Sequence, residues 1–406
     1  MIDEKPEVLG MDGERLARIP TFFQTYVDEG KLAGVVTLVS RRGQIVHCET
    51  LGSADAETGT PMATDTVFRI YSMTKPVTSV ALMALHEEGR FQLDDPVSRF
   101  IPAFADLRVW ADGTPLQFVT TFPEREMTIR DLLTHTSGLT YGFMARHPVD
   151  ALYRRRGIGG LDKAGTLAGM VDTLAELPLL FSPGSRWSYS VATDVCGHLV
   201  ELLSGTTLDR FFQERIFEPL DMVDTGFHVP DERLERFAAC YQKGADGAAQ
   251  LIDPPATSAY RQQPSFLSGG GGLVSTAGDY HRFCSMLLNG GVLDGVRILG
   301  RKTVEYMTLN HLPGGGDLTS MGQPVFSETS YDGIGFGLGF SITLDPAAAQ
   351  VVGSAGEYAW GGAASTMFWV DPAEELIGIM LTQLIPSGCW PIRREMRTLT
   401  YQALVD

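Results

Sequence analysis

The segment "FRIYSMTKPVTSVALMALHEEGR" (residues 68–90) places Ser72 and Lys75 three residues apart, directly before a long apolar run. The run is apolar on nearly every face, which is typical of a buried central helix. Pro76 lacks a backbone N–H and is tolerated only in the first turn, so the helix must begin near Ser72. Because residues three apart on a helix lie about 5–6 Å from each other at Cβ, we predict that the serine hydroxyl meets the lysine amine in a partly dry site.

This pair combines a nucleophile with a possible base. A serine hydroxyl attacks poorly until a base removes its proton, and a lysine with its ordinary pKa of about 10.4 is a poor base. Burial against the apolar run would lower the pKa of Lys75. The alternative is a helix-capping serine beside a solvated lysine. We favour the catalytic interpretation because this is the only Ser-x-x-Lys in the chain and a buried helix follows it.

Composition and charge limit the possible functions. The chain has 406 residues, which suits two lobes or one large composite domain. Its formal net charge of −17 repels phosphate, so we expect no nucleic-acid partner. The five cysteines are far apart and indicate buried or free thiols in a reducing compartment. Without a signal-peptide pattern or an apolar run of about eighteen residues, the expected location is the cytoplasm, with no membrane span.

Strand-like runs occur near both ends of the chain, in residues 33–40 and again after residue 335. Mostly helical patterns with long loops lie between them. We therefore predict an α/β (α+β) fold, in which one sheet is assembled from both ends of the chain and is covered by helices. Residues 1–90 and 266–406 would form this discontinuous α/β domain, and residues 91–265 an inserted, mainly helical domain.

Other catalytic motifs are missing or weak. No Gly-x-Ser-x-Gly occurs, which excludes the nucleophile elbow of the α/β-hydrolases as written. His135, in "THTSGL", is the only histidine in a motif-like loop, and we interpret it as structural. The chain has no His-Glu-x-x-His motif and no cluster of cysteine and histidine, and "GGGG" at residues 269–272 lacks the lysine of a phosphate loop. We therefore expect no metal ion and no cofactor.

The sequence "YSMTK" before a buried helix resembles the serine β-lactamases and penicillin-binding proteins. Further stretches resemble the class C branch of that superfamily, in its order and over most of the chain: residues 127–139, 181–205, 216–227 and 269–291. The resemblance implies a β-lactamase/transpeptidase-like fold, with an antiparallel sheet flanked by helices and an inserted helical domain.

Two motifs depart from the β-lactamase form. The second motif, usually Tyr-x-Asn, is "YSV" at residues 189–191, and the third, usually Lys-Thr-Gly, is replaced by "WGGA" at residues 360–363. Both resemble the family VIII carboxylesterases, which share the class C fold and cleave simple esters.

The resemblance implies roles for four residues. Ser72 would be the nucleophile, and Tyr189 and Lys75 would share the general-base work. Either a neutral lysine or a tyrosine phenolate beside a charged lysine would serve, and the sequence leaves both open. The oxyanion hole would consist of the backbone N–H groups of Ser72 and Ala363.

The same motifs imply the character of the substrate. Trp360 would offer an apolar wall where the β-lactamases present a cation, and Gly361 and Gly362 would let a substrate carbonyl approach the strand. Val191 removes an amide that would bind an amide of the substrate. With these four residues as substrate contacts, the site should prefer uncharged, apolar acyl and alcohol groups.

These observations predict a serine carboxylesterase that hydrolyses short- to medium-chain esters through an acyl-enzyme. Its expected partners are these small-molecule ester substrates. One alternative is an acyltransferase resembling the fungal statin side-chain transferase of this superfamily. Others are a weak β-lactamase or D-amino-peptidase, and a non-catalytic binding module on the same scaffold. We expect the pocket walls, and with them the specificity, to come from residues 141–157 and 253–266.

Overall fold

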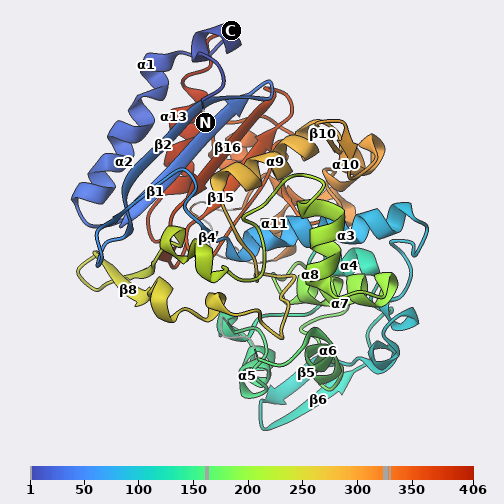
Figure 1. The fold of residues 1–406 in the computed structure, drawn as a ribbon. Helices are drawn as coiled ribbons and strands as arrows, with labels where there is room; N and C mark the ends of the chain where they lie inside the picture. The colour runs from blue at the N-terminus through green and yellow to red at the C-terminus, as the bar shows by residue number, and fades with distance from the viewer. Residues whose placement is uncertain (1, 161–163, 323–327, 329–330) are drawn as a thin grey trace.

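Both ends of the chain build one antiparallel sheet in the computed structural model, which describes residues 2–160, 164–322, 328 and 331–406 (Figure 1). The sheet has eight strands in the order β12-β13-β14-β15-β16-β1-β2-β3. At its centre, β1 (Gly34–Arg41) pairs with both β2 (Gln44–Asp55) and β16 (Leu376–Leu381). The other strands are β3 (Thr60–Pro61), β12 (Ile334–Phe336), β13 (Ser341–Thr343), β14 (Tyr358–Gly361) and β15 (Met367–Asp371). This arrangement confirms the predicted fold class.

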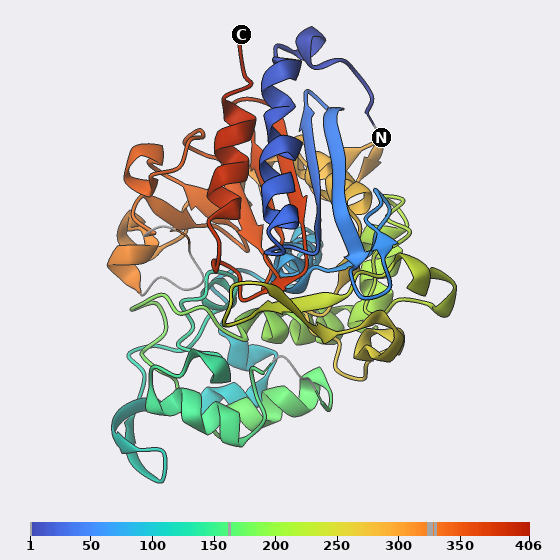
Figure 2. The same cartoon turned by 90° about the vertical axis from the view of Figure 1, so that its left-hand side faces the viewer.

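Helices cover both faces of the sheet, which explains why β1 is buried along its whole length. Successive side chains of a strand point to opposite faces, so Val35 and Val39 join one core cluster and Val36 and Leu38 join the other. Figure 2 shows α2 and α13 side by side on one face of the sheet. The covering helices are α1 (Gly13–Leu16), α2 (Arg18–Asp28) and α13 (Ile392–Tyr401) on this face, and α3 (Thr74–Glu87) and α9 (Ala277–Leu288) on the other.

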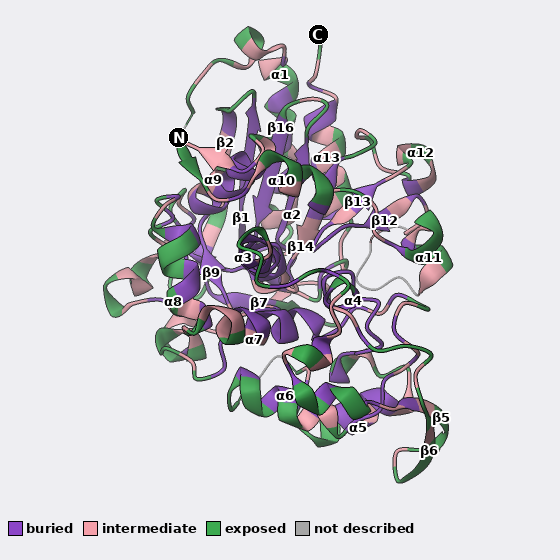
Figure 3. Cartoon of the chain, turned by 90° about the vertical axis from the view of Figure 1, so that its right-hand side faces the viewer, coloured by how far each residue is buried: buried purple, intermediate pink, exposed green. Residues whose placement is uncertain are grey.

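Helix α3 is the buried central helix that the sequence predicts. A 3₁₀ turn over Tyr71–Met73 leads directly into it, and Pro76 lies in its first turn. Every residue from Thr74 to Leu85 is buried, and Figure 3 shows the helix in the interior of the molecule. The predicted start near Ser72 is therefore confirmed.

Residues 91–265 carry helices together with two strand pairs. Of these pairs, β7 and β8 form a small sheet with β17 (Leu384–Ile385), so part of this segment joins the C-terminal part of the chain. The division into domains after residues 90 and 265 stays a prediction. The elements are β5 (Val109–Thr114), β6 (Gln117–Thr121), α4 (Ile129–Leu133), α5 (Pro148–Arg155), α6 (Leu167–Ala175), α7 (Ala192–Ser204), α8 (Leu208–Phe212), β7 (Cys240–Lys243) and β8 (Ala249–Asp253).

The outer parts of the C-terminal region complete the structure. Its smaller elements are β10 (Val292–Leu293), β11 (Val296–Arg297), α10 (Arg301–Met307), α11 (Leu318–Met321) and α12 (Pro346–Ala349). Within the described ranges, none of the helices has the length and apolar character that crossing a membrane requires.

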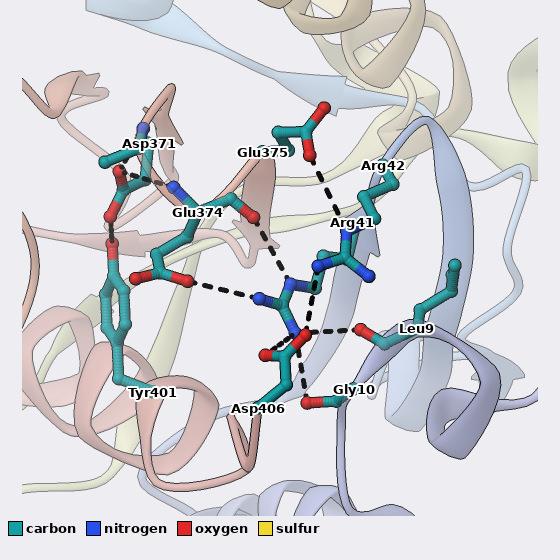
Figure 4. A network of polar contacts seen from close by, with 10 residues as sticks. Leu9, Gly10, Arg41, Arg42, Asp371, Glu374, Glu375, Tyr401 and Asp406 are labelled. Carbon is teal, nitrogen blue, oxygen red and sulfur yellow. Dashed lines mark hydrogen bonds and ion pairs between the residues drawn. The ribbon is translucent and has the colours of Figure 1, made fainter.

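A polar network joins the two ends of the chain at the end of the central strand β1 (Figure 4). The buried Arg41 of β1 donates hydrogen bonds to the carbonyl oxygens of Leu9 and Gly10 and, at 2.7 Å, to the carboxylate of Asp406. A second guanidinium nitrogen of Arg41 lies 3.2 Å from the Glu374 carboxylate. These contacts hold Leu9, Gly10 and the last residue, Asp406, against the end of β1.

Candidate active site

The chain reaches Ser72 through a short strand and a sharp turn. Strand β4 (Phe68–Arg69) pairs with β9 (Val274–Ser275), which brings the "GGGG" segment next to the start of α3. Tyr71 then takes a left-handed conformation, with φ of +42°, which an ordinary side chain seldom adopts. Such local strain at the residue before a candidate nucleophile is typical of functional sites.

Ser72, Lys75 and Tyr189 meet in space. The Lys75 Nζ lies 3.2 Å from the Ser72 Oγ, as expected for residues one helical turn apart. The Tyr189 hydroxyl donates a hydrogen bond of 2.6 Å to the same oxygen, although it comes from the segment just before α7. The serine oxygen thus lies between an amine and a phenol, both within reach for proton transfer.

Lys75 is buried without a carboxylate partner within ion-pair distance among the described residues. Its side chain is 1% exposed, and its Nζ lies 2.5 Å from the carbonyl oxygen of Gly270. The Nζ also lies over the rings of Tyr189 and Tyr141, at 4.5 and 5.4 Å from their centroids. Burial lowers the pKa of Lys75 to about 7, while the charge of Asp194 opposes this shift. A large fraction of the amine is therefore neutral near pH 7 and can accept a proton.

Tyr189 differs from Lys75 in its protonation. Burial raises the pKa of its phenol well above the ordinary value, although the hydrogen bond to Ser72 acts in the opposite direction. The phenol therefore stays protonated at neutral pH. Of the two alternatives that the sequence leaves open, the electrostatics favour a neutral lysine as the base and a tyrosine that donates.

The glycine-rich segment and Asp194 complete the surroundings of the lysine. The buried carboxylate of Asp194 accepts hydrogen bonds from the Ser268 hydroxyl at 2.5 Å and from the Gly270 N–H at 3.0 Å. A Cβ at position 270 would lie 2.7 Å from that carboxylate, so glycine is required there. The sequence did not predict this contact, because it joins segments more than seventy residues apart.

The "WGGA" segment lies at the end of β14, against the turn that carries Ser72. A Cβ on Gly362 would lie 2.4 Å from the carbonyl oxygen of Ile70, so only glycine permits this approach. The ring of Trp360 packs against that of Tyr189, with their centroids 5.4 Å apart. Among the described groups, the Ala363 N–H has no hydrogen-bond acceptor, which leaves it open to a substrate oxygen.

One cavity of about 860 Å³ opens onto these groups. It is lined by Ser72, Tyr189 and all four residues of the "WGGA" segment, together with the aromatic residues Tyr141, Phe143, Trp187, Tyr260 and Phe266. Tyr141, Phe143, Tyr260 and Phe266 belong to the two wall segments that the sequence predicts. The cavity is also lined by aromatic residues of other segments: Tyr71, Trp187, Phe227, Tyr331 and Phe368. Val191 is not brought to this cavity: it is buried and lines a neighbouring cavity of about 260 Å³.

Two further residues near the site are His135 and Arg393. The Nδ1 of His135 lies 3.1 Å from the Ser190 hydroxyl, and no contact with Ser72 is found in the part of the chain that the structure describes. The histidine ring also packs against that of Tyr189, with the centroids 5.0 Å apart, and its structural role stays a prediction. Arg393 of α13 also lines the cavity. No local pattern around this arginine distinguishes it from its neighbours in "IRREMR", so the sequence did not predict it.

A serine held between a buried lysine and a tyrosine, at the start of a helix that packs on an antiparallel sheet, is the arrangement of a serine hydrolase of the β-lactamase and penicillin-binding protein superfamily. The family model Beta-lactamase matches residues 19–394, and the chain therefore belongs to this family.

Known proteins agree with this assignment. Esterase EstB of Burkholderia gladioli is 33% identical over 98% of both chains. Protein Rv1367c of Mycobacterium tuberculosis is 38% identical, over 89% of this chain and 88% of its own. The solved structure of "EstCE1, a hydrolase with promiscuous acyltransferase activity" superposes with a TM-score of 0.79 and 29% identity, covering 96% of this chain and 99% of that chain. The predicted resemblance to the carboxylesterases of the β-lactamase superfamily is confirmed.

Proposed function

We propose that the protein is a serine carboxylesterase that hydrolyses short- to medium-chain esters through an acyl-enzyme on Ser72. The observation that carries the proposal is the Lys75 Nζ, lowered in pKa to about 7 and placed 3.2 Å from the serine oxygen. Esters are the expected substrates because the lysine of Lys-Thr-Gly is replaced by Trp360, and because EstB is an esterase.

The geometry supports the following steps. Lys75 takes the proton of Ser72 as the serine oxygen attacks the ester carbonyl. The N–H groups of Ser72 and Ala363 stabilise the oxyanion, and removal of one such donor typically lowers a rate by about 10²–10³. Tyr189, whose protonated hydroxyl is hydrogen-bonded to the serine oxygen, gives its proton to the leaving alcohol and regains one from Lys75. Water then attacks the acyl-enzyme with the same base, and the serine is restored.

The test is hydrolysis of p-nitrophenyl esters from C2 to C12, beside nitrocefin, by the wild-type protein and by Ser72→Ala. We expect turnover that is highest at short chain lengths and falls at least about 10³-fold in the variant. Ser79→Ala is a matched control, because Ser79 lies on the same helix and its buried hydroxyl has no partner among the described residues. Undiminished ester hydrolysis by Ser72→Ala would refute the proposal.

An acyltransferase is the second candidate, and the promiscuous acyltransferase activity of EstCE1 supports it. Addition of alcohols or amines to the ester assay separates the two activities, because a transferase would form more transfer product than acid. Efficient, saturable nitrocefin turnover would instead indicate a β-lactamase. The cytoplasmic location stays a prediction.

A further inference from the structure

Arg393 contacts the turn that carries the candidate oxyanion-hole residue. Its Nη2 donates hydrogen bonds to the carbonyl oxygens of Gly362, at 2.7 Å, and Thr366, at 2.9 Å. The Gly362 carbonyl and the Ala363 N–H belong to one peptide group. Because a trans peptide is planar, these two groups point in opposite directions. The position of the Gly362 oxygen therefore determines where the Ala363 N–H points.

We propose that Arg393 is a positioning residue that holds this peptide with the Ala363 N–H directed into the site. This inference rests on the proposed function, in which that N–H stabilises the oxyanion. The guanidinium acts in two ways: it fixes the peptide plane, and its charge polarises the carbonyl, which makes the N–H of the same peptide a stronger donor. Arg393 does not touch the reacting atoms.

The turn needs such an anchor because its backbone is permissive. Positions 361 and 362 are both glycine, the residue whose backbone is restricted least. The Gly362 N–H donates a hydrogen bond of 2.9 Å to the Thr366 carbonyl, which fixes the peptide before Gly362. The peptide after it, formed by the Gly362 carbonyl and the Ala363 N–H, is not fixed by this bond. Without the guanidinium, a rotation of that peptide would turn the Ala363 N–H away from the site at small cost.

The glycine pair also makes room for the arginine. A Cβ on Gly361 would lie 2.7 Å from the Arg393 Nη2, whereas one on Gly362 would lie 2.4 Å from the Ile70 carbonyl oxygen. One glycine thus admits the guanidinium, and the other admits the backbone that leads to Ser72. The sequence suggested that both glycines admit a substrate carbonyl. The structure gives each of them a contact within the protein.

The base of the arginine is itself held in place. The carboxylate of Glu328 accepts hydrogen bonds from the backbone N–H groups of Arg393, at 3.2 Å, and Arg394, at 2.9 Å, at the start of α13. The residue before them, Ile392, is 1% exposed and belongs to the core under the sheet. The guanidinium therefore extends from a fixed helix end.

A rival role for Arg393 is to bind an anionic group of the substrate. Its side chain lines the cavity, and its buried Nε has no partner among the described groups. The two roles differ in kinetics, because a substrate anchor acts on the ground state and a positioning residue acts on the transition state. The Nη2 contacts favour positioning, since both of its hydrogen atoms are directed to the turn.

The first measurement is the kinetics of Arg393→Met and Arg393→Lys on an uncharged p-nitrophenyl ester, with Arg18→Met as control. Arg18 is an exposed arginine of the neighbouring helix α2 and does not line the cavity. We expect kcat to fall about 10²-fold in Arg393→Met with KM within about threefold, and a smaller fall in Arg393→Lys, which keeps a single-point donor. Arg18→Met should keep the wild-type kcat. Unchanged kcat and KM on the uncharged ester, with KM raised only for an ester that carries a carboxylate, would overturn the proposal in favour of the substrate anchor.

The second measurement isolates the oxyanion hole. Sulfur is a weak hydrogen-bond acceptor, so an oxyanion hole makes the enzyme cleave an ester faster than the matching thionoester. We expect this rate ratio to fall about tenfold or more in both Arg393 variants. A general loss of structure would lower both rates together and leave the ratio unchanged. An unchanged ratio in folded variants would overturn the proposal, and Arg393→Lys decides the matter if Arg393→Met does not fold.

The same experiment separates failure of this inference from failure of the proposed function. If the wild-type protein cleaves esters and the Arg393 variants keep its rate ratio, only the inference fails. If the wild-type protein cleaves no ester, the rate of labelling by a fluorophosphonate, which also develops charge on oxygen, replaces the ester assay. Labelling about 10²-fold slower in Arg393→Met would support positioning. A wild-type protein that neither cleaves esters nor is labelled would overturn both.

Discussion

Two buried cations lie on either side of Ser72, and their surroundings are opposite. Arg69 is fully buried, and its guanidinium lies 2.7 Å from the carboxylate of Asp253. It also donates to the Ala238 carbonyl at 2.6 Å and to the Ser258 hydroxyl at 3.0 Å. Its charge is therefore paired and its hydrogen-bonding groups are largely satisfied.

Lys75, six residues later, is buried to nearly the same degree with much weaker partners. A serine hydroxyl, the carbonyl of Gly270 and two tyrosine rings surround its amine. Removing one partner of a buried ion pair destabilises the fold, because the other charge is left unpaired. A buried amine without such a partner tends instead to lose its proton. The comparison supports a structural role for Arg69, which pairs with the cavity-lining Asp253, and the proposed role of Lys75 as the base.

The largest expected effect is on activity in Lys75→Met. Loss of the base should lower kcat by about 10³–10⁴-fold. The free energy of unfolding should not decrease, because a side chain of similar length replaces an amine that is costly to bury. Ester turnover and urea unfolding of the same preparation measure both quantities. A variant within tenfold of wild-type kcat, or one that is strongly destabilised, would indicate that Lys75 has a structural role like that of Arg69.

The lysine should also appear in the pH dependence of stability. Its pKa in the folded protein is about 7, and in the unfolded chain about 10.4. Between these values the unfolded state binds more protons, so the lysine makes the unfolding free energy rise with pH, by about 1.4 kcal/mol per unit. Wild type minus Lys75→Met, measured by urea unfolding from pH 6 to 10, should show this slope above pH 7 and none below. A flat difference would mean that the lysine is not desolvated.

Arg69→Met should lower stability and leave activity nearly unchanged, the reverse of what is expected for Lys75→Met. We expect a loss of about 2–3 kcal/mol of stability, less than for a fully buried pair because Asp253 is a third exposed. The kcat of the molecules that remain folded should change little. A double-mutant cycle with Asp253→Asn should give a coupling of about 1 kcal/mol or more, and simple additivity would show that the ion pair does not contribute to stability.

The same contrast explains what could be predicted from the sequence. The Ser72–Lys75 contact spans one helical turn, so spacing and an apolar run were sufficient to predict it. Tyr189 and Ala363 reach the site from distant segments, and only resemblance to a family indicated them. Arg393 contacts the site across the β14–β15 turn, and no sequence pattern marks this contact.

In the fold, too, locally patterned elements could be predicted from the sequence, whereas elements that depend on distant partners could not. The strands β1 and β16 are mostly apolar and buried along their whole length because both of their faces are covered, and the sequence predicted them. The short strands β7, β8 and β17 depend on each other for pairing. Their local sequence is therefore weakly patterned, and the segment before residue 265 was expected to be mainly helical.

The smallest effect, and the sharpest test of the comparison, is on the pH dependence of activity. A neutral lysine base requires kcat/KM to rise with pH, with a midpoint near the Lys75 pKa of about 7. The charge of Asp194 raises that pKa, so Asp194→Asn should move the midpoint to lower pH, by less than about one unit. The asparagine oxygen can still accept the hydrogen bonds from Ser268 and Gly270, which separates charge from structure.

Asp253→Asn provides the matched control, because it removes a carboxylate that pairs with Arg69 and does not shift the pKa of Lys75. Its midpoint should equal that of the wild type. A profile of kcat/KM over pH 5–9 for the three proteins measures the effect. A midpoint that stays in place or rises in Asp194→Asn would show that the titrating group is not the lysine. The base would then be sought among the other groups around Ser72, beginning with Tyr189.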